Sequence, residues 1–184
     1  QQQLNRRSKR TNMDIYRDTT VTHGVNRPII RKGEVYLFGD ITEEMAGEFV
    51  RKLNEECPEE LTVYVSTNGG LVSAGLAIHD ALLDVPKTVV VASGMCASTG
   101  TLILLAGKSR WATPNTHFII HDVDLEPQAE EKNQEEITKH LNYLNAAIDT
   151  LFLSKLKDYF KAKELGIFGV DRAKKFGFIN GVIE

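Results

Sequence analysis

Gly94-Met95-Cys96-Ala97-Ser98-Thr99-Gly100 is the stretch that decides the fold. It follows a run of β-branched residues, Thr88-Val89-Val90-Val91, and precedes an apolar run with helical character, residues 102–106. The pattern predicts that Ser98 lies where a buried strand gives way to a buried helix, which is where α/β proteins place their chemistry. A serine hydroxyl there can attack a carbonyl while N–H groups of the helix N-terminus hold the oxyanion, or it can simply cap the helix.

Strands and helices alternate on both sides of this stretch, which predicts an α/β fold with strands buried on both faces. We expect a polar arm or loop over residues 1–33 and a single domain over residues 34–184. The predicted strands cover residues 34–39, 61–65, 88–91, 110–112, 116–121 and 178–183. The predicted helices begin near residues 42, 72 and 99, and two more cover residues 128–159 and 170–177.

Composition excludes several classes of protein. A net charge of −3 argues against nucleic acid as the main partner, although residues 1–17 carry four arginines and one lysine. No run approaches the roughly 18 apolar residues of a membrane span, and the start lacks the apolar centre of a secretory signal, so we expect no membrane partner. Cys57 and Cys96 indicate reduced thiols rather than a disulfide, which favours the cytoplasm or an organelle matrix or stroma.

Two further patterns accompany Ser98. Gly69-Gly70 follows a strand and either forms a simple tight turn or lets a substrate backbone come close. His117 and His121 share one face of a predicted strand but lie roughly 13 Å apart, so only one of them can meet Ser98. His121 is at the carboxyl end of the strand, the functional end of such sheets. We interpret His79 and His140 as packed or solvated residues.

Three short patterns follow one another along the chain: a strand then Gly-Gly, a strand then Gly-x-x-Ala-Ser-x-Gly, and a strand then Pro-Asn-x-x-x-x-Ile-His. In this combination the chain resembles the ClpP family of serine peptidases, the proteolytic subunits of Clp proteases, over about residues 34–184. The resemblance implies a ClpP/crotonase-like α/β fold of repeated β-β-α units with a protruding long helix, the handle. Residues 128–159, with their apolar stripe, fit that helix and oligomer contacts.

The resemblance also implies roles for individual residues. Ser98 would be the nucleophile and His121 the general base, and the N–H groups of Gly69 and Thr99 would hold the oxyanion. The implied function is a serine endopeptidase that cleaves unfolded or delivered polypeptides through an acyl-enzyme, in a heptameric ring, without metal or cofactor. An ATP-dependent unfoldase is the implied partner. Tyr64 either matches an aromatic residue of the family's pocket for that partner or is a buried tyrosine of a strand.

The third member of the catalytic triad is missing from its expected place. In the family an aspartate precedes an Ala-x-x-x-Gly-Leu-Ile-Asp segment, which matches residues 173–180, and counting back from it puts Leu165 at the aspartate's position. Our hypothesis is that the adjacent Glu164 serves instead. The alternatives are Asp122, Asp124 and Asp171.

Two other functions compete with proteolysis. Leu165, and a segment 122–127 that has three carboxylates and no glycine, fit a non-catalytic ring component or scaffold. A crotonase-type enzyme acting on acyl-CoA shares the implied fold, but such enzymes need no serine and histidine at these positions. The presence of both Ser98 and His121 argues against that alternative.

Overall fold

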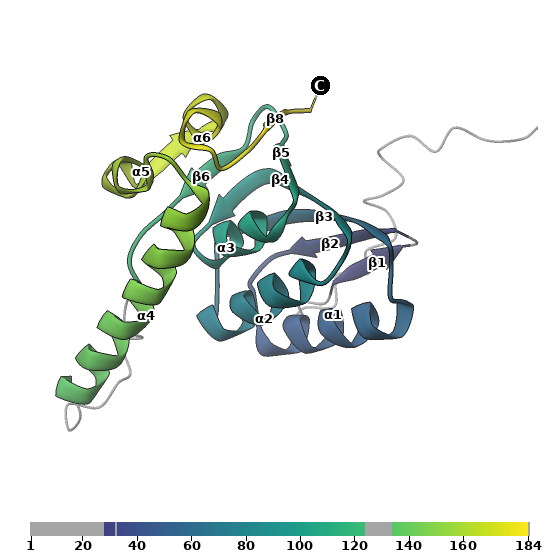
Figure 1. Cartoon of the computed structure of the whole chain (residues 1–184), viewed down its shortest axis with the longest axis horizontal. Coiled ribbons are helices and arrows are strands. Elements are labelled where there is room, and N and C mark those ends of the chain that lie inside the picture. The colour runs from purple at the N-terminus through teal and green to yellow at the C-terminus, as the bar shows by residue number, and fades with distance from the viewer. Residues whose placement is uncertain (1–27, 32, 124–133, 184) are drawn as a thin grey trace, which may run out of the picture.

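An eight-stranded, mostly parallel sheet flanked by helices forms the body of the molecule within residues 28–31, 33–123 and 134–183, which the computed structural model describes (Figure 1). In chain order the elements are β1 (Ile29–Arg31), β2 (Glu34–Phe38), α1 (Glu43–Glu56), β3 (Glu60–Thr67), α2 (Val72–Leu83), β4 (Lys87–Ala97), α3 (Thr99–Ala106), β5 (Ser109–Ala112), β6 (His117–Ile119), α4 (Gln134–Lys155), α5 (Tyr159–Leu165), β7 (Ile167–Gly169), α6 (Val170–Phe176) and β8 (Gly181–Val182). The predicted α/β fold is confirmed.

The central strand β4 has two successive partners on one side. The main path of the sheet runs in the order β1-β2-β3-β4-β5-β8, and along this path the strands from β2 onward are parallel. The first part of β4, Val89 to Ala92, pairs with β5, whereas Met95 to Ala97 pairs in parallel with β6. Gly94, with a φ of 70°, lies between the two parts. This change of partner brings the carboxyl ends of β4 and β6 side by side.

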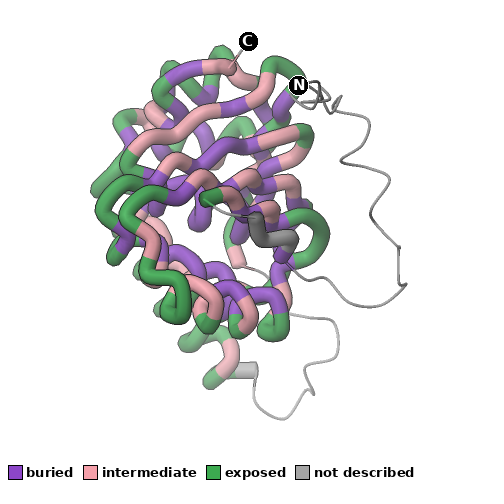
Figure 2. Tube along the Cα trace, turned by 90° about the vertical axis from the view of Figure 1, so that its right-hand side faces the viewer, coloured by how far each residue is buried: buried purple, intermediate pink, exposed green. Residues whose placement is uncertain are grey.

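Helix burial explains the sequence patterns on either side of β4. Every residue of α3 is buried, which is why this helix is apolar on all sides. Helix α2 packs against both α3 and α1, and buried residues follow the strands through the body (Figure 2).

Helix α4 projects away from the body (Figure 1), as expected for the handle. None of the helices in the described ranges combines the length and the apolar character needed to cross a bilayer.

The long helix predicted over residues 128–159 ends early, and the helix that follows it, α5, was not predicted. Residues 128–133 lie outside the described part of the chain, and α4 ends at Lys155 before α5 begins at Tyr159. Between them Leu156 is buried, and the N–H of Lys157 donates to the carbonyl of Phe176 instead of continuing the helix. Periodicity alone did not reveal this break because both helices contribute apolar residues to the same core.

Both ends of the sheet also differ from the sequence-based boundaries. Strand β1 pairs with β2 in an antiparallel hairpin, so the sheet starts within the stretch that we expected to be an arm or loop. At the other end, β8 contains only Gly181 and Val182 of the strand predicted over residues 178–183. Phe178 and Ile179 before it are buried and fill the core without joining the sheet. A short strand, β7, was not predicted.

Helix α1 provides a first test of the fold, because its N-cap is defined by one hydrogen bond. The hydroxyl of Thr42 accepts from the N–H of Met45 at 3.2 Å. Replacing Thr42 with alanine is expected to lower the free energy of unfolding by about 1 kcal/mol, measured by urea denaturation. Thr42→Ser keeps the hydroxyl and should retain most of that stability. Equal losses in the two variants would show that the hydroxyl is not the stabilising group.

Candidate active site

Ser98 is the single residue between β4 and α3, and its backbone is strained. Its φ of 52° and ψ of −121° place it in a positive-φ region that residues with a side chain rarely adopt, at a cost of about 1–3 kcal/mol. The turn is held on both sides. The Ser98 N–H donates to the carbonyl of Ile119 at 2.9 Å, and the Ser98 carbonyl accepts from the Thr101 hydroxyl at 2.6 Å. Although Ser98 occupies the N-cap position, its side chain makes no capping hydrogen bond, so the capping interpretation is wrong.

The Gly69-Gly70 turn lies against Ser98. A Cβ added to Gly69, whose φ is 119°, would be 2.7 Å from Cβ and 3.2 Å from Oγ of Ser98. Real Cβ atoms essentially never approach so closely, so only glycine fits beside this serine. The turn is fixed from its other side, because the Gly69 carbonyl accepts from the N–H of Ile41 at 2.9 Å. Gly69 thus approaches the serine closely, and the approach of a substrate backbone to the glycine pair stays a prediction.

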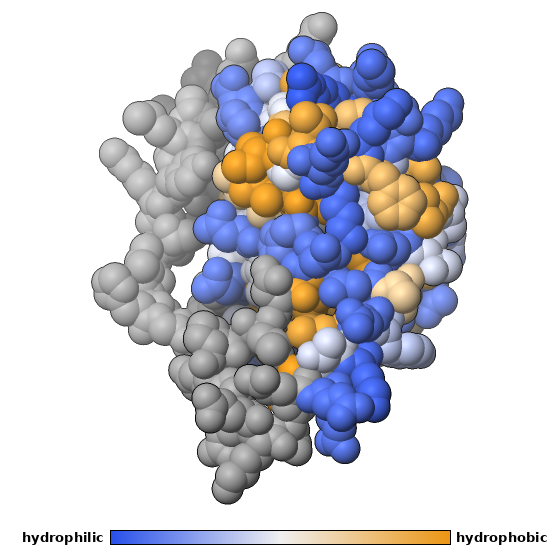
Figure 3. Space-filling model, turned by 90° about the vertical axis from the view of Figure 1, so that its left-hand side faces the viewer, coloured by the Kyte–Doolittle hydropathy of each residue, from blue (hydrophilic) through white to orange (hydrophobic). Residues whose placement is uncertain are grey.

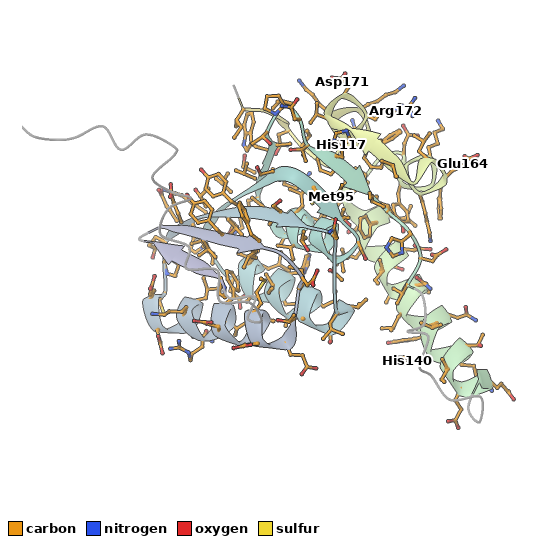
Figure 4. The ribbon with its side chains drawn as sticks, turned by 180° about the vertical axis from the view of Figure 1, so that it is seen from behind. Met95, His117, His140, Glu164, Asp171 and Arg172 are labelled. Carbon is orange, nitrogen blue, oxygen red and sulfur yellow. The ribbon has the colours of Figure 1, made fainter. Side chains whose placement is uncertain are left out.

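His121 and Ser98 line the same pocket, of about 580 Å³. His121 follows β6 by two residues, and β6 runs parallel to the second part of β4, so both side chains belong to the carboxyl ends of neighbouring strands. His117, in contrast, lines a separate cavity together with Asp171 and Arg172 (Figure 4). Of the two histidines on the predicted face, it is thus His121 that the structure brings together with Ser98.

Comparison with known proteins identifies the family. A family model described as Clp protease matches residues 17–184 of the chain. The chain belongs to the Clp protease family. A solved structure of ClpP1 from Listeria monocytogenes, an asparagine-to-aspartate mutant, is similar, with a TM-score of 0.66 and 28% sequence identity over 83% of this chain and 91% of that chain. The handle, the glycine turn and the serine turn described above are thus features of a Clp protease family member.

The two oxyanion donors that the sequence analysis names lie on either side of Ser98. Thr99 is the first residue of α3, where backbone N–H groups have no partner inside the helix. The N–H of Gly69 donates to the hydroxyl of Thr67 at 2.9 Å. Oxyanion binding by Gly69 therefore requires this N–H to turn from the Thr67 hydroxyl toward the pocket. Both backbone N–H groups thus lie close to the serine, and that of Gly69 is hydrogen bonded to Thr67.

The strand register locates the position of the missing carboxylate. Strands β6 and β7 are antiparallel, with Ile119 opposite Ile167, and the N–H of Ile120 donates to the carbonyl of Gly166 at 2.9 Å. Continuing this register by one more residue puts Leu165 opposite His121. In this Clp protease family member, an exposed leucine thus stands where an orienting carboxylate would reach the histidine.

None of the acidic residues considered from sequence offers its carboxylate at that position in the described chain. Glu164 is exposed at the outer edge of α5 (Figure 4), and Asp171 lines the cavity that contains His117. The carboxylate of Asp122 forms an ion pair with Lys163 at 2.5 Å. Asp124 lies outside the described residues. The hypothesis that Glu164 completes the triad therefore finds no support in the geometry.

Lys163 joins the segment after His121 to two helices. Its ammonium group on α5 contacts Asp122 at 2.5 Å and Asp149 of α4 at 3.0 Å, and Tyr159 donates its hydroxyl proton to the same Asp149 at 2.6 Å. Burial by itself would lower the pKa of Lys163, but its hydrogen bonds to the two aspartates raise the pKa above the ordinary value. Burial, together with the bond to Asp149, raises the pKa of Tyr159. Sequence reasoning missed this network because no local motif links its members.

One wall of the pocket comes from the handle. Besides Ser98 and His121, the pocket is lined mainly by apolar side chains from α2, α3 and α4, among them Leu76, Leu102, Leu144, Ile148 and Phe152. His140 of α4 also lines it and is exposed, in agreement with the solvated position interpreted from sequence. The apolar stripe of α4 faces the site as well as the core. An apolar pocket beside a serine suits an apolar side chain of a substrate.

The remaining side chains of chemical interest lie outside this pocket. Cys96 is fully buried, and burial raises the pKa of its thiol to about 12, so the thiol stays protonated at neutral pH and does not compete with the serine. Both Cys96 and Cys57 are free thiols, as predicted. His79 is buried in α2 and contacts Asp80 at 2.9 Å. Among the described residues, no group of three or more histidines, cysteines or carboxylates could hold a metal ion.

Proposed function

We propose that this Clp protease family member is a serine endopeptidase. The observation that carries the proposal is the strained Ser98, which shares one pocket with His121 and packs against Gly69. In the proposed reaction Oγ of Ser98 attacks the substrate carbonyl while His121 takes its proton and later gives that proton to the leaving amine. The acyl-enzyme is then hydrolysed by water. No step requires a metal or cofactor.

The proposed substrate is an unfolded or delivered polypeptide with an apolar side chain at the residue before the cleaved bond. The apolar lining from α2, α3 and α4 supports this preference, since burying an apolar side chain there stabilises the complex by roughly 1.5–3 kcal/mol. Family membership supports assembly into a heptameric ring, and large apolar side chains are exposed on the side of α4 and α5 (Figure 3). They are Tyr143, Leu153, Phe160, Leu165 and Ile167.

An ATP-dependent unfoldase is the proposed partner of the ring. The feature that supports it is an aromatic group on β2 and β3, where Tyr64 stacks on Tyr36 with 4.8 Å between the ring centres and Tyr36 meets Phe38 edge to face. Tyr64 is only partly buried, so the group is accessible from outside the core. The unfoldase takes no part in the proposed catalytic chemistry, which needs only the residues of this chain.

Leu165 favours a second function, a non-catalytic ring component or scaffold. Without a carboxylate opposite His121, the imidazolium formed during the reaction lacks its usual counter-charge. Such a component would assemble normally but leave Ser98 unreactive. The two functions thus differ in the reactivity of one hydroxyl group.

Labelling with a fluorophosphonate separates the two functions. Ser98 is expected to displace fluoride and form one phosphonyl adduct, detected by intact mass, because His121 removes its proton. The adduct should be absent from Ser98→Ala and unchanged in Ser154→Ala, which removes an exposed hydroxyl on α4. An assembled wild-type protein that forms no adduct would contradict the peptidase proposal and favour the scaffold.

A further inference from the structure

We propose that the main-chain carbonyl of Asp122 replaces the missing carboxylate of the triad, and that Asn145 on α4 is the positioning residue that holds this carbonyl toward His121. The inference deepens the proposed function and rests on it, because it concerns the orientation of the proposed general base. It explains how His121 is oriented although Leu165 stands at the position of the usual aspartate.

The first observation is the contact that His121 makes. Its Nδ1 lies 2.6 Å from the carbonyl oxygen of Asp122. A carbonyl oxygen can only accept a hydrogen bond, so in neutral His121 this contact places the proton on Nδ1 and leaves Nε2 as an acceptor. Nε2 is the atom that takes the proton of a catalytic serine. The carbonyl thus selects the same tautomer that an aspartate would select.

The second observation is that Asn145 holds the other end of the same peptide group. The N–H of Val123 donates to Oδ1 of Asn145 at 2.8 Å, and Nδ2 of Asn145 donates to the Val123 carbonyl at 3.4 Å. The N–H of Val123 and the carbonyl of Asp122 belong to one planar peptide group, in which they point in opposite directions. Fixing the N–H on α4 therefore fixes the direction of the carbonyl that faces His121.

Lys163 anchors the same peptide from its other side. It forms an ion pair with the carboxylate of Asp122 at 2.5 Å and is itself held by Asp149 of α4 at 3.0 Å. The ion pair directs the Asp122 carboxylate toward α5, and the carbonyl of the same residue is the group that meets His121. Asn145 and Lys163 together leave this peptide little freedom to rotate.

The chemistry of this arrangement differs from that of a full triad in one respect. A carbonyl orients the imidazole and fixes its tautomer, but it carries no charge to stabilise the imidazolium. In serine proteases with a full triad, replacing the aspartate with asparagine lowers turnover by about 10⁴, and this loss is attributed to the wrong histidine tautomer. Because the tautomer is correct here, we expect most of that loss to be avoided.

A carbonyl cannot be removed by substitution, so the test acts on Asn145. Asn145→Ala is expected to slow fluorophosphonate labelling of Ser98 by about 10²-fold, the typical effect of misplacing a catalytic group by about 1 Å. Asn145→Asp should restore most of the rate, since its carboxylate still accepts from the N–H of Val123. Asn142→Ala, which removes an exposed amide from the same helix, serves as the control and should label like the wild type.

The decisive readout is the protonation of His121 in the wild-type protein. In protein labelled with ¹⁵N-histidine, at a pH at which His121 is neutral, the proton is expected on Nδ1, and Asn145→Ala should shift population toward Nε2. A wild-type proton on Nε2, or unchanged labelling in Asn145→Ala, would overturn the inference. Because the tautomer is read without any reaction, a protein with the proton on Nδ1 but no labelling would support this placement and contradict only the peptidase function.

Discussion

Replacing His121 with alanine is expected to slow peptide hydrolysis by at least about 10⁴-fold. Removing the histidine of a serine-protease triad costs about as much as removing the whole triad, because the serine then keeps its proton. His121 is the histidine that lines the pocket of Ser98, so the loss should appear in kcat rather than in KM. The measurement is the hydrolysis of a fluorogenic peptide with an apolar residue before the cleaved bond.

His117→Ala is the matched control for this prediction. His117 lies four residues earlier on the same predicted face, but it lines the separate cavity beside Asp171 and Arg172 (Figure 4). Its removal should leave kcat within a few-fold of the wild type. If His117→Ala caused the larger loss, the assignment of the general base to His121 would be wrong.

Gly70→Ala is expected to destabilise the fold by more than about 4 kcal/mol, a loss typical of severe strain or overpacking. The φ of Gly70 is 149°, and a Cβ at this position would lie 2.2 Å from the carbonyl oxygen and 2.7 Å from the nitrogen of Ile41. These atoms belong to the backbone and cannot move aside as a flexible side chain would. The substitution therefore pushes the glycine turn away from the loop before α1. Urea denaturation, monitored by circular dichroism, measures the resulting decrease in the free energy of unfolding.

Gly33→Ala separates the clash from the backbone strain. Gly33 also has a positive φ, of 77°, but no other heavy atom lies within 4 Å of its added Cβ. Its replacement should cost only the 1–2 kcal/mol or so of a left-handed residue with a side chain. Similar losses in the two variants would show that close packing against Ile41 does not constrain Gly70.

Several parts of the site could be predicted because they depend on local sequence. A glycine pair, a serine between small residues and a histidine each follow a strand, and parallel strands place their carboxyl ends at one edge of the sheet. The meeting of Gly69, Ser98 and His121 follows from that rule. The partner change along β4 was not predicted, since it depends on which strands arrive beside it later in the chain.

Other parts could not be predicted because they depend on contacts between distant segments. The break between α4 and α5 arises where Lys157 meets Phe176, and strand β7 is three residues long, too short to show a period. The anchoring of the segment after His121 requires Asn145 to come from another helix. Of the features around His121 that depend on distant segments, only the absence of the carboxylate, at Leu165, could be predicted from sequence.

The pairing of β4 with two strands also divides the chemistry between two parts of the chain. The serine and both proposed oxyanion donors precede β5, whereas His121, its anchors and the handle side of the pocket all follow β5. Substitutions after β5 can therefore change which polypeptides are accepted, or how the base is oriented, without disturbing the strained turn of the nucleophile. Position 165 also lies after β5, so leucine in place of an acidic residue there leaves the serine turn, which lies before β5, intact.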